Sequence, residues 1–180
     1  MSINNTQTNI YLIGYRATGK TVVGQKLAEQ LGRRFVDADQ YLEQKAGMPV
    51  SEIVSRFGWE DFRENESIVI AELSNQNNLV VATGGGVVLD PQNVNILKQT
   101  GIVIWLDASP DTIISRMEND PNTKTQRPAL SDRFSSMQQE VKQTLAQRLD
   151  LYEKASDIRI ATDNKTPEDI CNQIGYQIKE

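Results

Sequence analysis

The chain has 180 residues, of which 19 are lysine or arginine and 24 are aspartate or glutamate, so its formal net charge is −5. It contains no histidine and a single cysteine, Cys171, which excludes Ser-His triads, histidine metal clusters and disulfides within the chain. The acidic balance argues against a nucleic-acid-coating protein, and no apolar run is long enough to cross a membrane. We therefore expect one soluble domain over residues 1–180, a monomer in the reducing cytoplasm, with no nucleic-acid or membrane partner.

A short apolar strand at residues 10–13 leads into the pattern G-x-x-x-x-G-K-[ST], which runs from Gly14 to Thr21. Glycines allow the backbone N–H groups of such a loop to surround a phosphate at the start of a helix, whose dipole also favours an anion. Lys20 would reach the β- and γ-phosphates, and the Thr21 hydroxyl would bind Mg²⁺. A helical stripe ending at Gly32 follows, so the context indicates a nucleotide site rather than a glycine-rich turn with an incidental lysine.

The next strand, at residues 35–36, opens onto Asp37 and Asp39, and a helix then extends to Gly47. Because the two acids are two residues apart, one can face a metal ion while the other faces a neighbouring substrate. Aspartate is also favoured at the start of a helix, so a pair of helix-capping residues is an equally good interpretation.

A helix predicted over residues 50–74 has an expected break near Gly58. Arg63 and Glu66 lie three residues apart on it and share one face, so they can pair with each other. The ordinary explanation is an exposed ion pair that contributes little to stability.

A buried strand at residues 79–82 runs into three successive glycines, Gly84, Gly85 and Gly86. Three glycines together indicate a close approach of the backbone to a ligand, whereas a simple turn would need fewer. A crossover helix at residues 91–99 leads to a second buried strand at 102–106. Asp107 follows this strand and resembles a Walker B acid, but we interpret it as a strand-end residue.

A helix capped by Ser109 fades into a polar, unpatterned segment that ends at Arg127 in the motif R-P-A-L. An arginine here could swing onto a transferring phosphate, although a surface arginine explains it equally well. A long helix over about residues 132–155, a strand at 158–161 and a helix opening near 166–168 complete the chain. Strands that alternate with helices predict a parallel sheet with ligands at the carboxyl ends of its strands.

Six motifs, in order and over nearly the whole chain, resemble those of the shikimate kinase family, a branch of the nucleoside-monophosphate-kinase-like P-loop proteins. They are G-x-x-x-x-G-K-T, F-V-D-A-D, F-R-E-N-E, T-G-G-G, R-P-A-L and R-L-D-L-Y. The resemblance implies a three-layer α/β/α fold around a central five-stranded parallel sheet of strand order 2-3-1-4-5. It further implies an acceptor-binding segment at about residues 38–75 and a mobile lid at about 117–131.

The resemblance also implies that the enzyme transfers the γ-phosphoryl group of ATP to the 3-hydroxyl of shikimate, in aromatic amino acid biosynthesis. The ATP-binding residues would be Gly14, Ala17, Thr18, Gly19, Lys20, Thr21, Val22, Arg116, Arg127 and Asn164. Shikimate would be held by Asp39, Arg63, Gly84, Gly85, Gly86 and Arg148, and Mg²⁺ by Thr21 and Asp37.

The resemblance divides the roles within this site. Lys20, Asp39 and Arg127 would be catalytic, with Asp39 as the base and Arg127 closing on the γ-phosphate. Arg116 would lie against the adenine, and Glu66 would orient Arg63. The residue types suit the substrate, because guanidinium groups grip a carboxylate and a carboxylate accepts hydroxyl protons.

Two other functions remain open from the residues. The same fold could serve a kinase for gluconate or for a nucleoside monophosphate, although Asp39, Arg63 and the glycines suit a small hydroxy-acid better. A GTPase-type switch is disfavoured, because no D-x-x-G pattern occurs and Asn164-Lys165-Thr166-Pro167 fails the N-K-x-D pattern.

Overall fold

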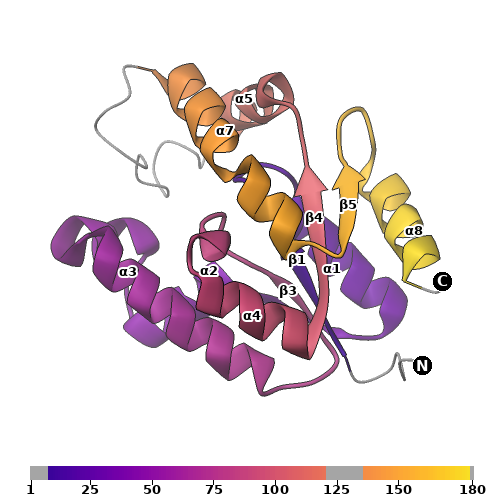
Figure 1. Cartoon of the computed structure of the whole chain (residues 1–180), viewed down its shortest axis with the longest axis horizontal. Coiled ribbons are helices and arrows are strands. Elements are labelled where there is room, and N and C mark those ends of the chain that lie inside the picture. The colour runs from indigo at the N-terminus through magenta and orange to yellow at the C-terminus, as the bar shows by residue number, and fades with distance from the viewer. Residues whose placement is uncertain (1–7, 121–135, 179–180) are drawn as a thin grey trace.

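The structure, a computed structural model, describes residues 8–120 and 136–178 (Figure 1). The strands are β1 (Asn9–Ile13), β2 (Arg34–Asp37), β3 (Leu79–Ala82), β4 (Gly101–Asp107) and β5 (Ile158–Ala161). The helices are α1 (Lys20–Leu31), α2 (Ala38–Ala46), α3 (Val50–Ser74), η1 (Val87–Leu89), α4 (Pro91–Thr100), α5 (Pro110–Asn119), α7 (Met137–Ala155) and α8 (Pro167–Gln177). In this part of the chain, no helix is both long and apolar enough to span a membrane.

The five strands form one sheet in the order β2-β3-β1-β4-β5, and every neighbouring pair is parallel. This confirms the fold class and the strand order predicted from the sequence. β1 lies at the centre, between β3 and β4. Because all strands run the same way, the segments that follow them emerge at one edge of the sheet.

Helices cover both faces of the sheet (Figure 1). The side chains of β1 alternate between the apolar clusters on these two faces. Tyr11 and Ile13 belong to the apolar cluster that includes residues of α3, α4 and α7. Ile10 and Leu12 belong to the cluster that includes residues of α1 and α8. Successive side chains of a strand point to opposite faces, so β1 is buried on both and reads as a continuous apolar run.

The element boundaries follow local signals in most places. Gly58 interrupts α3 with φ 89° and ψ 173°, which confirms the expected break, and Gly32 ends α1 in the left-handed conformation. The helix predicted from about residue 132 starts later, at Met137. Ser136 is extended, with φ −154° and ψ 157°, and its side chain caps the new helix; residues 132–135 lie outside the described part of the chain.

Gly24 lets α1 pack tightly on the sheet. A Cβ at this position would lie 2.5 Å from a ring carbon of Phe35 and 3.2 Å from a methyl carbon of Leu12. We predict that Gly24→Ala lowers the free energy of unfolding by about 1–3 kcal/mol, because the added methyl overpacks this contact. Urea unfolding followed by circular dichroism measures the change.

Gly175 in α8 provides the matched control, because a Cβ there meets nothing within 4 Å. Gly175→Ala should raise the free energy of unfolding by about 0.5–1 kcal/mol through helix propensity alone. A Gly24→Ala protein as stable as Gly175→Ala would contradict the close packing of α1.

Candidate active site

Two adjoining hollows lie where the segments after the strands emerge. The first, of about 320 Å³, is here called the α3 hollow; its lining includes Trp59, Arg63 and Glu66 of α3. The second, of about 220 Å³, is called the P-loop hollow; its lining includes Gly19, Lys20 and neighbouring residues. The residues that border both hollows are Arg16, Thr21, Asp37, Asp39, Gly85 and Asp120.

The P-loop, residues 14–21, is held open by unusual backbone conformations. Gly14 has φ 139°, and a Cβ there would clash with the carbonyl oxygen of Leu106 at the end of β4. Ala17 and Gly19 also have positive φ, 61° and 97°. Such a run of conformations turns backbone N–H groups inward, which is the arrangement that cradles phosphate.

Lys20 folds back across the P-loop. Its Nζ atom donates hydrogen bonds to the carbonyl oxygens of Gly14 and Tyr15, each at 2.8 Å. The ammonium group therefore lies over the loop itself, where it borders the P-loop hollow. A phosphate placed in the loop would lie within the reach of this cation.

Asp37 performs two tasks with its two carboxylate oxygens. Oδ1 accepts hydrogen bonds from the backbone N–H groups of Asp39 and Gln40 and so caps α2. Oδ2 accepts a 2.8 Å hydrogen bond from the Thr21 hydroxyl. The capping interpretation and the metal interpretation thus apply to different atoms of one residue. A hydroxyl beside a carboxylate suits Mg²⁺, which binds few protein groups when phosphates and water supply the other ligands.

The glycines after β3 make room for side chains of the site. A Cβ on Gly84 would clash with Oε1 of Glu66 and lie 2.9 Å from Oδ1 of Asp39. A Cβ on Gly86 would clash with the Arg63 guanidinium. The glycines therefore allow the backbone to approach these side chains closely, and they border the α3 hollow.

The Arg63–Glu66 pair is largely buried, so the interpretation as an exposed surface pair is wrong. Nη1 of Arg63 lies 2.5 Å from Oε2 of Glu66, whose side chain is 3% exposed. The guanidinium also lies over the rings of Trp59 and Phe62. Burial raises the pKa of the Glu66 carboxyl, and the Arg63 guanidinium acts in the opposite direction. The carboxylate thus fixes where the arginine points.

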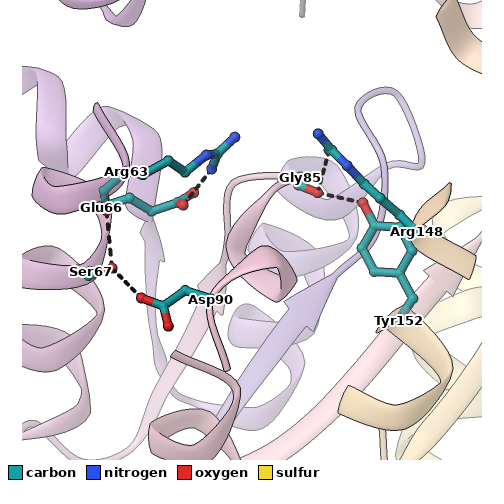
Figure 2. A network of polar contacts seen from close by, with 7 residues as sticks. All are labelled: Arg63, Glu66, Ser67, Gly85, Asp90, Arg148 and Tyr152. Carbon is teal, nitrogen blue, oxygen red and sulfur yellow. Dashed lines mark hydrogen bonds and ion pairs between the residues drawn. The ribbon is translucent and has the colours of Figure 1, made fainter. Parts of the chain in front are cut away.

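Figure 2 shows Arg63 and Arg148 on either side of Gly85, with both guanidinium groups directed toward the space between them. Nη1 of Arg148 and the hydroxyl of Tyr152 both donate to the Gly85 carbonyl oxygen, at 3.1 and 2.5 Å. Burial raises the pKa of Tyr152 to about 12, so the phenol remains a donor. No role was predicted for Tyr152, although it ends the R-L-D-L-Y motif and lies one helical turn from Arg148.

Arg116 connects the P-loop to the turn after β5 through hydrogen bonds. Nη1 donates to the carbonyl oxygen of Ala17 at 3.1 Å, and Nη2 donates to that of Thr162 at 3.0 Å. Asn164 lies in the same turn with φ 54°. The Asp163 carboxylate, whose pKa is lowered by hydrogen bonds from Thr112 and Ser109, fixes this turn against α5. Neither Arg116 nor Asn164 borders either hollow in the described residues.

Four residues considered in the sequence analysis remain to be placed, namely Val22, Thr18, Arg127 and Asp107. Val22 borders the P-loop hollow, and Thr18 donates its hydroxyl hydrogen bond back to the Tyr15 carbonyl at 2.8 Å. Arg127 lies outside the described residues, so its role stays a prediction. Asp107 accepts hydrogen bonds from Arg159 at 2.7 and 3.1 Å and borders neither hollow, as expected for a strand-end residue.

Comparisons with known proteins agree with this geometry. The family model for shikimate kinase matches residues 16–179. A shikimate kinase of Syntrophus aciditrophicus (strain SB) is 42% identical over 176 residues, covering 94% of this chain and 90% of that protein. A shikimate kinase of Sulfurihydrogenibium sp. (strain YO3AOP1) is 40% identical over 171 residues, covering 95% and 98%.

A solved structure, shikimate kinase from Acinetobacter baumannii in complex with shikimate, superimposes with a TM-score of 0.90. It is 34% identical in sequence and covers 97% of this chain and 94% of that one. The sheet order, the P-loop and the match over nearly the whole sequence all lead to the same assignment. The chain belongs to the shikimate kinase family of ATP-dependent phosphotransferases.

Proposed function

We propose that the protein transfers the γ-phosphoryl group of ATP to the 3-hydroxyl of shikimate, yielding shikimate 3-phosphate and ADP for aromatic amino acid biosynthesis. The observation that carries the proposal is the shared border of the two hollows. Asp39 lies on that border, with Lys20 on the P-loop side and Arg63 and Arg148 on the α3 side. A base therefore lies between a phosphate-binding group and two groups suited to a carboxylate.

In the α3 hollow, Arg63 and Arg148 grip the shikimate carboxylate, and Gly84, Gly85 and Gly86 bring the backbone close to the ring. Both arginines are oriented before the substrate arrives, Arg63 by Glu66 and Arg148 by the Gly85 carbonyl. Pre-oriented guanidinium groups lose less freedom on binding, and they match a carboxylate in geometry and charge.

In the transfer step, the 3-hydroxyl oxygen of shikimate forms a bond to the γ-phosphorus while the bond from that phosphorus to the bridging oxygen breaks. The electron pair of the broken bond goes to ADP, and the hydroxyl proton goes to Asp39. Lys20 moves from the loop carbonyls onto the β- and γ-phosphates, and Arg127 closes over the γ-phosphate. Positioning and charge neutralisation dominate such a loose transition state, so histidine is not needed.

Thr21 and Asp37 would hold Mg²⁺, the Thr21 hydroxyl directly and the Asp37 carboxylate through water. When bound, this ion neutralises charge on the phosphates. Arg116 and Asn164 border the adenine through the turn after β5. We also propose a monomer, since the described residues of one chain line both hollows. We place it in the cytoplasm, since the single cysteine has no partner in the chain for a disulfide bond.

A coupled assay of ADP release tests the proposed reaction with shikimate, gluconate and a nucleoside monophosphate as acceptors. We expect turnover with shikimate to exceed that with the others, because two arginines and one aspartate fit its carboxylate and hydroxyls. A preference for gluconate or for a monophosphate would contradict the proposal.

Lys20→Ala should lower kcat by about 100-fold or more, because a preorganised cation at the transferred phosphoryl is lost. Steady-state kinetics with ATP and shikimate measures the change. Lys26→Ala is the matched control, since Lys26 lies on the same helix and pairs with Glu168 at the surface. Near-normal turnover by Lys20→Ala would contradict the P-loop assignment.

Arg63→Ala should raise the KM for shikimate about 10- to 100-fold and change the KM for ATP little, because a charged hydrogen bond to the carboxylate is lost. The control is Arg56→Ala on the same helix, where an exposed arginine pairs with Glu52. Equal effects of Arg63→Ala on both substrates would indicate a structural role instead.

Asp37→Asn separates capping from metal binding, because asparagine caps a helix as well as aspartate does. We expect the thermal midpoint to stay near that of the wild type while the Mg²⁺ affinity falls about 10- to 100-fold. Calorimetric titration of Mg²⁺ in the presence of ADP measures the affinity. Asp90→Asn is the control, since Asp90 caps α4 and borders neither hollow; equal losses in both variants would exclude the metal role.

A further inference from the structure

Arg16 occupies the border between the two hollows. Among the residues that the structure describes, it is the single basic side chain that lines both. Lys20 lines the P-loop hollow alone, and Arg63 and Arg148 line the α3 hollow alone. A group that passes from one hollow to the other therefore passes Arg16.

Three of the other five residues on this border are acidic. Asp37, Asp39 and Asp120 line both hollows together with Arg16. A phosphoryl group carries negative charge on its oxygens throughout its transfer, so any carboxylate of this border that no cation or proton offsets opposes its passage. A fixed cation at the same place offsets that repulsion, and it does so most strongly where water is excluded.

A carboxylate from a distant helix holds the Arg16 guanidinium in place. Nη2 of Arg16 lies 2.8 Å from Oε1 of Glu140, and the two side chains are 12% and 9% exposed. The Tyr15 hydroxyl donates to the same oxygen at 3.4 Å, and the guanidinium lies over the Tyr15 ring. Glu140 belongs to the first turn of α7, so the contact joins residues 124 positions apart.

The Arg16 guanidinium has N–H groups that make no hydrogen bond within the described part of the chain. Within residues 8–120 and 136–178, Arg16 donates hydrogen bonds through Nη2 alone. Nη1 and Nε make no such bond there, so N–H groups of the rigid, planar guanidinium remain available to phosphate oxygens. Glu140 thus orients the Arg16 guanidinium and leaves some of its N–H groups free to donate to another acceptor.

We propose that Arg16 is a further catalytic residue, which donates hydrogen bonds to the phosphoryl group as it passes between the hollows, and that Glu140 is its positioning residue. This inference rests on the proposed function. The bonds that form and break are those of the transfer described above, with the hydroxyl proton going to Asp39. Arg16 exchanges no proton, because guanidinium stays charged in proteins.

Arg16→Met tests the catalytic role. We expect kcat to fall about 100-fold, as for removal of one transition-state donor, while both KM values change less than about threefold. Arg159→Met is the matched control, because Arg159 makes a similar 2.7 Å pair with Asp107 and borders neither hollow. A kcat equal to that of the control, or a loss confined to the KM for shikimate, would overturn the proposal.

Binding of a transition-state analogue provides a second measurement that does not depend on turnover. With Mg²⁺, ADP, aluminium fluoride and shikimate, Arg16→Met should bind the fluoride complex about 100-fold more weakly than the wild type. The affinity for ADP alone should be unchanged, which also shows that the site is folded. Equal weakening of both complexes would indicate a structural role and overturn the proposal.

Arg16→Lys covers the case in which the methionine variant does not fold. It keeps the positive charge, but an ammonium group cannot hold Glu140 and reach a phosphate with a planar fork, so kcat should still fall about tenfold or more. Wild-type kcat in this variant would overturn the proposal.

Glu140→Gln tests the positioning role. We expect kcat to fall about tenfold in the wild-type background and to change no further in the Arg16→Met background, because Glu140 acts through Arg16. An undiminished effect in the double variant would overturn the positioning role. If the wild type phosphorylates no shikimate, the proposed function itself fails; if it does and the Arg16 variants are normal, this inference alone fails.

Discussion

The site depends on one constraint, the parallel direction of all five strands of the sheet. Because the strands share a direction, the P-loop after β1, Asp37 at the end of β2 and the glycines after β3 emerge at a single edge. Three segments that are far apart in the chain thereby surround one space. A mixed sheet would send one of them to the opposite edge and divide the phosphate groups from the acceptor groups.

Charged groups of the site are oriented by partners within the chain. Glu66 holds Arg63, Glu140 holds Arg16, and the Gly85 carbonyl holds Arg148. Taking a charge out of water costs free energy unless a partner compensates, and each of these partners compensates one guanidinium. Groups fixed in this way would need little reorganisation in the proposed reaction, and positioning together with electrostatic stabilisation supplies most of the catalysis in phosphoryl transfer.

Several residues make two kinds of contact at the same time. Asp37 caps α2 through Oδ1 and meets Thr21 through Oδ2, so the two interpretations of its motif do not compete. Gly84 and Gly86 likewise form a turn and make room for Glu66 and Arg63. A substitution at such a position changes two properties together, and only a replacement that preserves one of them can distinguish their contributions.

The sequence by itself determined the P-loop, the break at Gly58 and the helix that ends at Gly32, because these depend on periodicity and on neighbours a few residues away. The strand order followed only from the resemblance of six motifs to those of a known family, since strand pairing joins residues far apart in the chain. Only the tertiary structure decided that Glu66 is buried and that Arg16 meets Glu140, a residue 124 positions away. Periodicity tells which face of a helix is apolar, but it does not tell which distant polar side chain will meet it. That choice is made by the packing of α3 and α7 against the sheet, where desolvation leaves a charged group stable only beside its partner.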